Sequence, residues 1–471
     1  MKHRQRKGVL FGVGLVFLGG IVQGQEFEGA IIAEESIYQP VVAETGMVST
    51  AEAHATRIGL EVLKSGGNAV DAGVAVAAAL AVTYPRAGNL GGGGFMLIHE
   101  AERSRTVALD FRETAPAGAT RDMFLDESGE ADSRLSRYSP LASGVPGTVR
   151  GLAHALDRFG TISWAEALEP AIRLADEGFP VYRDLHDSLE SISRSDHFGE
   201  EARAVYLDSD GRAPDIGSRF QQPELATTLR LLAAEGPSAF YEGAIADRIV
   251  AAMAGSGGLI SKADLAAYRV VEREPVAGTY RGHEILSMPP PSSGGVHIIQ
   301  MLNILEPYPI GEWGHNAAVT VHHMAEAMRR AYADRAEHLG DTDFVPVPVA
   351  GLISRAYADE LRADIDPRSA TPSSAVRAGT PPPPESLETT HFSIVDRWGN
   401  AVSCTYTLNF SYGSGIMVPG TGILLNNQMD DFSAKPGVPN AYGLIGGEAN
   451  AIEPGKRMLS SMSPTLVLRD G

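Results

Sequence analysis

The stretch Leu387-Glu388-Thr389-Thr390-His391-Phe392-Ser393-Ile394-Val395 turns abruptly into strand pattern after a tether that contains Pro381-Pro382-Pro383-Pro384. Prolines lack a backbone N–H and cannot join a helix, so the tether predicts exposed polyproline or irregular chain. From Thr390 the sequence alternates with a period of two, residues 396–400 have turn composition, and residues 401–408 resume as strand. The stretch therefore predicts a β-hairpin that begins at a threonine.

A threonine at such a junction can act as a catalytic nucleophile if the peptide bond before it is cut. Its hydroxyl is then a nucleophile, and its own α-amino group, with a pKa of about 7.7–8, can serve as the base. While Thr390 is still bonded to Thr389, that base does not exist. The hypothesis is self-cleavage, in which the Thr390 hydroxyl attacks the Thr389 carbonyl and the resulting ester hydrolyses. The alternative is that Thr390 is only a β-branched residue at the start of a strand.

The first 24 residues have the pattern of a secretory signal peptide. Four basic residues precede an apolar run over residues 9–22, and small residues follow it. The run is shorter than the roughly 20 residues that a spanning helix needs, so an uncleaved anchor is the weaker alternative. No cysteine follows, which excludes a lipoprotein anchor at this point. We therefore expect a periplasmic or secreted protein.

The net charge and the cysteine content exclude some partners and any intrachain disulfide. The formal net charge of −19 argues against nucleic acid or an anionic membrane as a partner. Cys404 is the single cysteine of the 471 residues, so no intrachain disulfide can form, and its strand context predicts a small buried hydrophobe. Export without disulfides fits a bacterial periplasm or exterior, because a chain of this length can bury a large core.

Outside the hairpin, the sequence predicts alternating helices and strands. Helix patterns cover residues 51–63, 68–81, 223–235, 296–305 and 316–338, and strand patterns cover residues 95–98 and 106–111. Ser163 and Glu166 form a capping box at the start of a helix that Pro170 should kink or divide. The run Gly91-Gly92-Gly93-Gly94 matches neither a dinucleotide nor a phosphate-binding loop, so close packing is the expected role.

Conventional metal, serine and thiol chemistry is unsupported. His322 and Glu326 have a metal-ligand spacing on a helix, but the second histidine of His-Glu-x-x-His is absent and the better interpretation is a solvated helix face. No Gly-x-Ser-x-Gly elbow, Cys-x-x-Cys pair or calcium loop occurs. We expect neither a metal nor an organic cofactor.

Polar residues form a second candidate site. Arg112, between Asp110 and Glu113, is by itself more typical of a surface salt bridge than of a ligand contact. Asparagine and aspartate clusters usually indicate turns. Together these residues could instead bind an α-amino acid, with arginine and serine for its carboxylate and aspartate and amide oxygens for its ammonium. The candidates after the hairpin are Thr407, Asn409, Gln428, Asp431, Ser460 and Ser461.

Six motifs in order resemble those of the bacterial γ-glutamyltransferases, also called glutathione hydrolases. The resemblance runs from about residue 34 to the last residue, and each motif is weak alone. The motifs are Asn89-Leu90-Gly91-Gly92-Gly93-Gly94-Phe95, Asp110-Phe111-Arg112-Glu113, Met288-Pro289-Pro290-Pro291-Ser292-Ser293-Gly294-Gly295, Thr389-Thr390-His391, Asn426-Asn427-Gln428-Met429-Asp430-Asp431-Phe432 and Lys456-Arg457-Met458-Leu459-Ser460-Ser461-Met462-Ser463-Pro464.

The resemblance implies an α+β fold, the four-layer αββα sandwich of N-terminal-nucleophile hydrolases. It also implies a precursor that cuts itself between Thr389 and Thr390. Beside the signal peptide (1–24), we therefore expect a large subunit (25–389) and a small subunit (390–471, incomplete at its C-terminus) in one intertwined unit. Glutathione and related γ-glutamyl compounds would be the donors, and water, amino acids or dipeptides the acceptors. By this resemblance, Thr390 would be nucleophile and base, and Thr407 would support the Thr390 hydroxyl. The α-carboxylate of the donor would be bound by Arg112, Ser460 and Ser461, and its α-ammonium by Asn409, Gln428 and Asp431. Tyr442 would lie on a lid over the pocket.

One departure from the family pattern keeps other functions open. The family's small subunit continues into a Gly-Ser-Pro-Gly-Gly-Ser segment whose amides form the oxyanion hole, whereas this sequence stops at Asp470-Gly471. Loss of such donors costs about 10²–10³-fold in rate, so we expect a fragment or a truncated relative. Two alternatives therefore stand beside γ-glutamyl transfer: an acylase for glutaryl-β-lactam or polyglutamate substrates, and an inactive binder of γ-glutamyl compounds.

Overall fold

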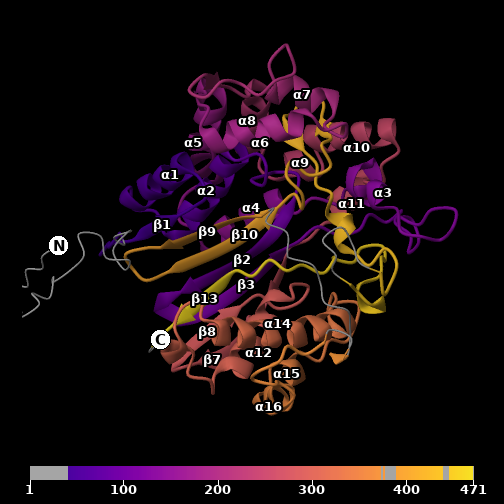
Figure 1. The fold of residues 1–471 in the computed structure, drawn as a ribbon. Coiled ribbons are helices and arrows are strands. Elements are labelled where there is room, and N and C mark those ends of the chain that lie inside the picture. Colours follow the sequence, from indigo (N-terminus) through magenta and orange to yellow (C-terminus); the bar gives the residue numbers. More distant parts are fainter. Residues whose placement is uncertain (1–40, 373–374, 377–388, 439–444, 470–471) are drawn as a thin grey trace, which may run out of the picture. The chain divides into compact units, whose positions relative to one another are not determined.

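Two antiparallel sheets lie face to face, and helices cover the outer face of each (Figure 1). The structure is a computed structural model that describes residues 41–372, 375–376, 389–438 and 445–469. The helices and strands all belong to the unit Thr45–Gly471. The predicted αββα sandwich is confirmed.

The predicted hairpin lies inside the larger sheet, with a further strand on each side of it. The hairpin strands pair with each other, and each also pairs with a strand from the first part of the chain. The order across the sheet, with every neighbouring pair antiparallel, is β1 (Met47–Ser49), β9 (Thr390–Val395), β10 (Ala401–Thr407), β2 (Gly93–Glu100), β3 (Arg105–Phe111) and β6 (Val271–Arg273).

The turn of the hairpin is built around one aspartate. The Asp396 carboxylate accepts hydrogen bonds from the backbone N–H groups of Trp398 (2.9 Å) and Asn400 (3.0 Å). Gly399 takes a positive φ of 83°, which a residue without Cβ adopts at little cost. The other carboxylate oxygen accepts from the N–H of Ala69, 3.0 Å away at the start of the next layer's helix. One side chain thus closes the hairpin and ties it to the helical layer.

The glycine run lets β2 pack closely against its neighbours. A Cβ on Gly91 would lie 2.1 Å from the carbonyl oxygen of Leu424, and one on Gly92 would lie 2.1 Å from that of Thr407. Such distances are shorter than any van der Waals contact, so a side chain at either position would force the backbones apart. The predicted packing role of the glycines is confirmed.

An apolar helical layer covers one face of the larger sheet. Its central helix, α2 (Ala69–Thr83), is capped by Asn68 and buries every one of its residues. Small side chains at most of its positions allow close approach to Phe392, Val402 and Tyr406 of the hairpin. The other helices of this layer, and those behind it, include α1 (Ala53–Lys64), α4 (Thr148–Phe159), α5 (Trp164–Glu177) and α8 (Pro223–Glu235).

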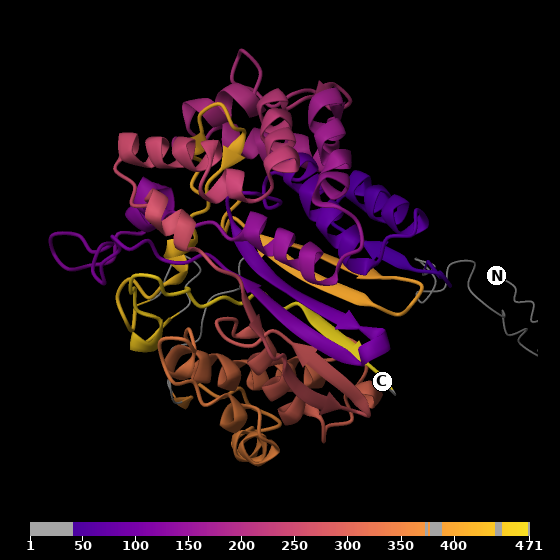
Figure 2. The same cartoon turned by 180° about the vertical axis from the view of Figure 1, so that it is seen from behind.

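The smaller sheet lies on the opposite face of the larger one. Its order is β13 (Thr465–Leu468), β8 (His283–Ser287) and β7 (Val276–Tyr280). Phe95, Leu97, Met288 and Met462 form an apolar cluster between the sheets. The outer helices of this side, seen from behind in Figure 2, are α12 (Gly294–Leu305), α14 (Ala318–His338), α15 (Val349–Leu352) and α16 (Arg355–Ala363).

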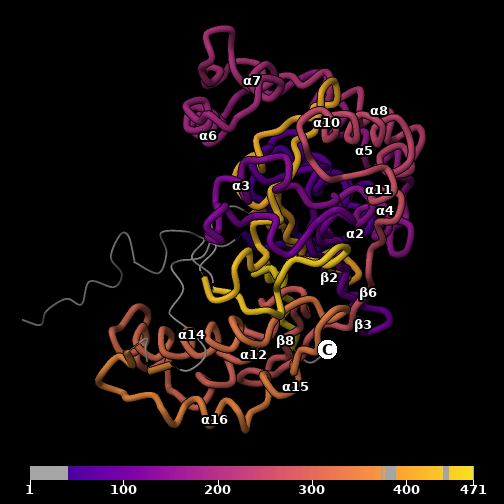
Figure 3. Tube along the Cα trace, turned by 90° about the vertical axis from the view of Figure 1, so that its right-hand side faces the viewer, coloured from indigo at the N-terminus to yellow at the C-terminus, as the bar shows by residue number. Residues whose placement is uncertain are grey.

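Further short elements extend the first helical layer, as the turned view in Figure 3 shows for α6, α7 and α10. They share a large apolar cluster with α5 and α8. These elements include α6 (Arg183–Ser193), α7 (Glu200–Tyr206), α9 (Ser238–Tyr241), α10 (Ala244–Ser256), α11 (Lys262–Ala267), β4 (Phe179–Pro180), β5 (Arg219–Phe220), β11 (Met417–Val418) and β12 (Ile423–Leu424), while α3 (Ser133–Tyr138) and α13 (Ile310–Trp313) lie elsewhere in the unit.

The sequence predictions of the elements agree with these bounds, with one difference. The capping box of Ser163 and Glu166 is present, but α5 continues through Pro170 as a single helix. Of the two predicted effects of Pro170, a kink or a division, the division is therefore wrong. In the part of the chain that the structure describes, no helix is both long and apolar enough to span a membrane. The predicted signal peptide and the proline tether lie outside the described residues.

Candidate active site

The hairpin carries Thr390 to the first position of β9, opposite Tyr406 of β10. The Thr390 side chain is 2 % exposed, and its hydroxyl has no hydrogen-bond partner among the described residues. A buried hydroxyl without a partner costs free energy, which the fold must offset elsewhere. The preceding residue, Thr389, is exposed and lines a cavity beside the strand. The junction between the two threonines therefore lies beside this cavity, with Thr389 in its wall.

That cavity, of about 280 Å³, brings most of the predicted site residues together. It opens where β10, the segment after it and residues 459–463 converge, on the face of the sheet that points toward the smaller sheet. Thr390 itself is not among the lining residues, because strand alternation places its side chain on the same face of β9 as the buried Phe392 and Ile394. The predicted residues that line it are Arg112, Thr389, Thr407, Asn409, Gln428, Asp431, Ser460 and Ser461.

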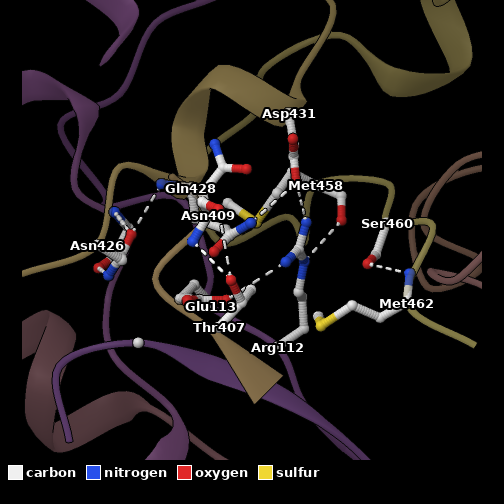
Figure 4. A network of polar contacts seen from close by, with 12 residues as sticks. Arg112, Glu113, Thr407, Asn409, Asn426, Gln428, Asp431, Met458, Ser460 and Met462 are labelled. Carbon is white, nitrogen blue, oxygen red and sulfur yellow. Dashed lines mark hydrogen bonds and ion pairs between the residues drawn. The ribbon is translucent and has the colours of Figure 1, made fainter. Parts of the chain in front are cut away.

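Arg112 lies at the base of the cavity, directly after β3, and is 0 % exposed. Its Nη2 forms an ion pair with Asp431, and its Nε donates to the carbonyl oxygen of Met458 at 3.3 Å (Figure 4). Its Nη1 is buried without a hydrogen-bond partner in the described chain. The sequence interpretation of Arg112 as a surface salt bridge is therefore wrong, because the surrounding strands and the segment at Met458 cover it completely.

Gln428 and Asp431 face Arg112 from a short 3₁₀ helix, Gln428–Asp431. Gln428 Nε2 donates to Asp431 Oδ2 at 2.9 Å, which leaves Gln428 Oε1 buried and without a partner among the described residues. Asn426 fixes this turn, since its Oδ1 accepts from the N–H of Gln428 at 3.0 Å and its Nδ2 donates to the carbonyl of Gly91 at 2.9 Å. The polar run is thus both a turn and part of the cavity.

Thr407 and Asn409 form the wall at the end of β10. The N–H of Asn409 donates to the Thr407 hydroxyl at 2.9 Å, and Asn409 adopts a positive φ of 84°. Asparagine tolerates this conformation better than other residues with a Cβ. Asn409 Nδ2 donates to the carbonyl oxygen of Asn427 at 3.0 Å. The unusual backbone conformation therefore turns Asn409 toward the segment that carries Gln428.

Ser460 and Ser461 are held by the proline-serine-glycine loop before α12. Ser460 exchanges two backbone hydrogen bonds with this loop, from its N–H to Pro291 (2.8 Å) and from the N–H of Ser293 to its carbonyl (2.7 Å). A Cβ on Gly294 would lie 2.1 Å from the Ser463 hydroxyl oxygen. The loop therefore needs glycine there, and it serves as the template on which the two serines are placed.

Glu113 adds a buried carboxyl group beside Arg112. Its Oε2 lies 3.8 Å from Arg112 Nη1, and neither of its oxygens has a hydrogen bond within the described chain. Burial raises the pKa of Glu113 to about 7, although the positive charge of Arg112 opposes the shift. At neutral pH, Glu113 therefore neutralises the arginine only in part.

Arg335 is a lining residue that the sequence reasoning missed. It is 5 % exposed and reaches the cavity from α14, with Nε 3.3 Å from the Ser293 hydroxyl and Nη2 3.4 Å from the Ser461 hydroxyl. Burial lowers its pKa to about 10. A signal was present, since Arg335 follows the buried Ala327 and Ala331 at spacings of four and lies on the core-facing stripe of the helix.

On the same helix, the interpretation of a solvated face is wrong for Glu326, whereas His322 is partly exposed. Glu326 is buried and forms a 2.7 Å ion pair with Arg330. Among the described residues, no group of three or more histidine, cysteine, aspartate or glutamate side chains could hold a metal ion. The predicted lid residue, Tyr442, lies outside the described residues.

A threonine at the start of a central strand, a cavity beside it and four αββα layers define the class of N-terminal-nucleophile hydrolases. The family model "Gamma-glutamyltranspeptidase" matches residues 55–471, and the chain belongs to this family.

Individual relatives support both statements. The chain is 53% identical over 441 residues to the glutathione hydrolase proenzyme of Escherichia coli, covering 93% of this chain and 75% of the relative. The crystal structure of Helicobacter pylori γ-glutamyltranspeptidase superposes with a TM-score of 0.70 at 42% identity, over 73% of this chain and 98% of that one. A cephalosporin acylase from Bacillus halodurans superposes with a TM-score of 0.79 at 29% identity, over 94% and 79% of the two chains.

Proposed function

We propose that the protein cleaves the γ-glutamyl amide bond of glutathione and related γ-glutamyl compounds through an ester on Thr390. The acyl group then passes to water, or to the amine of an amino acid or dipeptide. Family membership and the similarity to a glutathione hydrolase proenzyme support this activity. The reaction needs no metal or organic cofactor, because nucleophile, base and binding groups are all side chains or backbone groups of the protein.

The observation that carries the proposal is a pair of unsatisfied groups in one cavity. Arg112 Nη1 is a donor and Gln428 Oε1 an acceptor, and both are buried without a hydrogen-bond partner among the described residues. An α-amino acid presents a carboxylate and an ammonium on one carbon, so a single γ-glutamyl group can satisfy both. Ser460 and Ser461 extend the donor side, and Asn409 and Asp431 the acceptor side.

Self-cleavage explains how Thr390 would gain access to the cavity. The Thr390 hydroxyl oxygen attacks the Thr389 carbonyl carbon, the C–N bond breaks, and the ester is hydrolysed by water. Thr390 then carries a free amine that takes the hydroxyl proton in later turnovers, with the Thr407 hydroxyl nearby as support. Because Thr389 lines the cavity in the uncut chain, its departure would open the space next to the nucleophile.

The proposal includes two chains from one precursor, residues 25–389 and 390–471, which stay associated. The proenzyme name of the E. coli relative supports a processed precursor. The basic and apolar start of the sequence supports export to the periplasm or the exterior, with residues 1–24 removed. Tyr442 would cover the bound γ-glutamyl group from the glycine- and proline-rich loop.

A related acylase activity is the second candidate, favoured by the structural similarity to the cephalosporin acylase. Glutaryl compounds lack the α-ammonium group, so they would leave Gln428 Oε1 and Asp431 without a cationic partner. The acceptor groups in the cavity therefore favour γ-glutamyl over glutaryl donors. A ratio of kcat/KM values for the two donors decides between them.

The decisive experiment follows the intact mass of the purified protein at neutral pH, beside Thr390→Ala and Thr390→Ser variants. We expect wild type to split between Thr389 and Thr390 and then to release glutamate from glutathione. The alanine variant should do neither, and the serine variant should still split, because it keeps a hydroxyl. An alanine variant that splits at the same bond removes Thr390 from the mechanism. A wild-type chain that binds L-glutamate but releases none from glutathione is an inactive binder.

A further inference from the structure

Arg335 differs from the other deeply buried arginines because no acidic group of the described residues lies at ion-pair distance from it; the charge of Asp431 acts on it only from further away and partly opposes the lowering of its pKa by burial. Arg112 pairs with Asp431, Arg330 with Glu326, and Arg457 with Asp110. In the described part of the chain, Arg335 contacts only two hydroxyls, those of Ser293 and Ser461. A buried guanidinium without a counter-charge is costly unless an anion joins it. Its position on the cavity wall identifies a ligand as the source of that anion.

The hydrogen bonds that Ser460 and Ser461 accept also indicate an anionic ligand at this place. A guanidinium only donates, so the Ser461 oxygen must accept from Arg335 Nη2, and its own hydrogen is left to point elsewhere. The Ser460 oxygen likewise accepts from the N–H of Met462 at 3.1 Å. Both serines line the cavity and keep a hydroxyl hydrogen for a ligand. Two converging hydroxyl donors suit the two oxygens of a carboxylate.

The charged groups around the cavity sum to an excess of positive charge, and Arg335 supplies that excess. Arg112 already engages Asp431, and the pKa of Glu113 at about 7 leaves that carboxyl partly neutral. Burial lowers the pKa of Arg335 only to about 10, so Arg335 keeps its charge at neutral pH. An uncharged ligand group at the serines would leave this charge with only the more distant carboxylate of Asp431, which is already paired with Arg112.

We propose that Arg335 is a positioning residue that selects donors carrying an α-carboxylate: it fixes the Ser461 hydroxyl as a donor and supplies the charge that the carboxylate neutralises. The inference rests on the proposed function and goes beyond it, since it adds a residue of α14 to the carboxylate side of the cavity. Arg335 acts mainly through Ser461, so its effect depends on that hydroxyl.

The test compares two chromogenic amides that differ in one group. One is the 4-nitroanilide of the γ-carboxyl of L-glutamate, and the other is the 4-nitroanilide of 4-aminobutyrate, which lacks the α-carboxylate. Arg335→Gln should lower kcat/KM for the first amide by about 10- to 100-fold, as expected for a charge-assisted hydrogen bond, and hardly change that for the second. Arg335→Lys should lie between wild type and glutamine, because one ammonium replaces the charge without the fork geometry.

Two controls separate positioning from folding. Arg330→Gln removes another buried arginine of α14, away from the cavity, and should lower the unfolding midpoint without changing the ratio between the two amides. Combining Arg335→Gln with Ser461→Ala should add little to either change alone, because both disturb one contact. Equal losses of Arg335→Gln on both amides would overturn the inference and indicate a structural role.

The outcome can be separated from that of the proposed function. If wild type hydrolyses neither amide, the proposed function fails, and the same comparison is made by calorimetry with L-glutamate and 4-aminobutyrate as ligands. Wild type should then prefer L-glutamate, and Arg335→Gln should reduce that preference about tenfold or more. Absence of any preference for L-glutamate in wild type, or a preference that survives in Arg335→Gln, contradicts the inference.

Discussion

The two faces of the β9–β10 hairpin have different tasks. Toward α2, the hairpin presents Phe392, Val402 and Cys404, which are buried in an apolar cluster. Toward the smaller sheet it presents His391, Thr405 and Thr407, which line the cavity. Because neighbouring residues of a strand point to opposite faces, one short hairpin holds the fold together on one side and carries chemistry on the other. Substitutions on the two faces should therefore separate stability from activity.

The largest effect is expected on the cavity side, from Arg112→Gln. Removal of one partner of a buried ion pair costs about 3–5 kcal/mol, and here the unpaired partner, Asp431, lies in the binding site. We expect kcat/KM for a γ-glutamyl donor to fall by about 10²–10³-fold, mainly through KM. Arg112→Lys should recover little, since the fork of contacts to Asp431 and Met458 needs a guanidinium. Full activity in the glutamine variant would mean that the donor binds elsewhere.

On the helix side, Ile98→Ala tests the opposite half of the comparison. Ile98 is buried opposite Val402, and its truncation leaves a cavity in the apolar layer. The free energy of unfolding should fall by about 2–5 kcal/mol, measured by urea denaturation. Measured below the unfolding transition, kcat/KM should stay within about threefold of wild type. A large loss of activity in the folded variant would show that the two faces are coupled.

A smaller effect, dependent on pH, is expected from Glu113. Its pKa rises from the ordinary 4.5 to about 7 on folding, so between these pH values the folded state holds a proton that the unfolded state has lost. Stability therefore decreases as pH rises from 4.5 to 7 and is level above that range, with a loss of about 2 kcal/mol between pH 5 and pH 8.

Glu113→Gln is the matched control for this pH dependence, because glutamine has nearly the same shape and does not titrate. Urea midpoints measured at pH 5 and pH 8 should differ less in the variant than in wild type. The same slope in both proteins would assign the pH dependence to other groups.

The smallest effect is expected at Cys404, on the helix side of β10. The thiol is fully buried, and burial raises its pKa well above the ordinary value. An alkylating reagent at pH 8 should leave the native protein unmodified and fully active, and should add one group per chain in urea. Rapid modification of the native protein would contradict the close packing against α2.

Two helices show how much the sequence could predict. The alanine-rich pattern predicts a closely packed helix over residues 68–81, and the structure has α2 at Ala69–Thr83 with every residue buried. The pattern of α14 predicts a helix of the correct length but misleads about its faces. Val321, Met324 and Met328 are exposed, whereas Glu326 and Arg335 are buried. Glu326 is paired with Arg330 one turn along the same helix. Arg335 instead contacts Ser293 and Ser461, which are distant in the sequence and which no local period contains.

The same distinction applies to the cavity. The order of the short motifs was enough to predict that one site contains Arg112, Asn409, Gln428, Asp431, Ser460 and Ser461, and all six line the same cavity in the structure. The turn of Thr390 away from the cavity in the uncut chain, the pairing of Arg112 with Asp431 and the contact of Arg335 with Ser461 were not predictable. Each depends on how separate layers meet.

The position of the hairpin between β1 and β2 determines how the protein can fold before and after cleavage. A cut before Thr390 would leave β9 and β10 as the inner strands of a sheet whose outer strands belong to the other piece. The uncut chain can assemble this sheet as a unimolecular event, but two separated pieces must find each other, so their recovery after denaturation depends on concentration. The uncut protein would therefore fold once without a partner. After the cut, a denatured and diluted sample would refold poorly, because the two pieces must associate again.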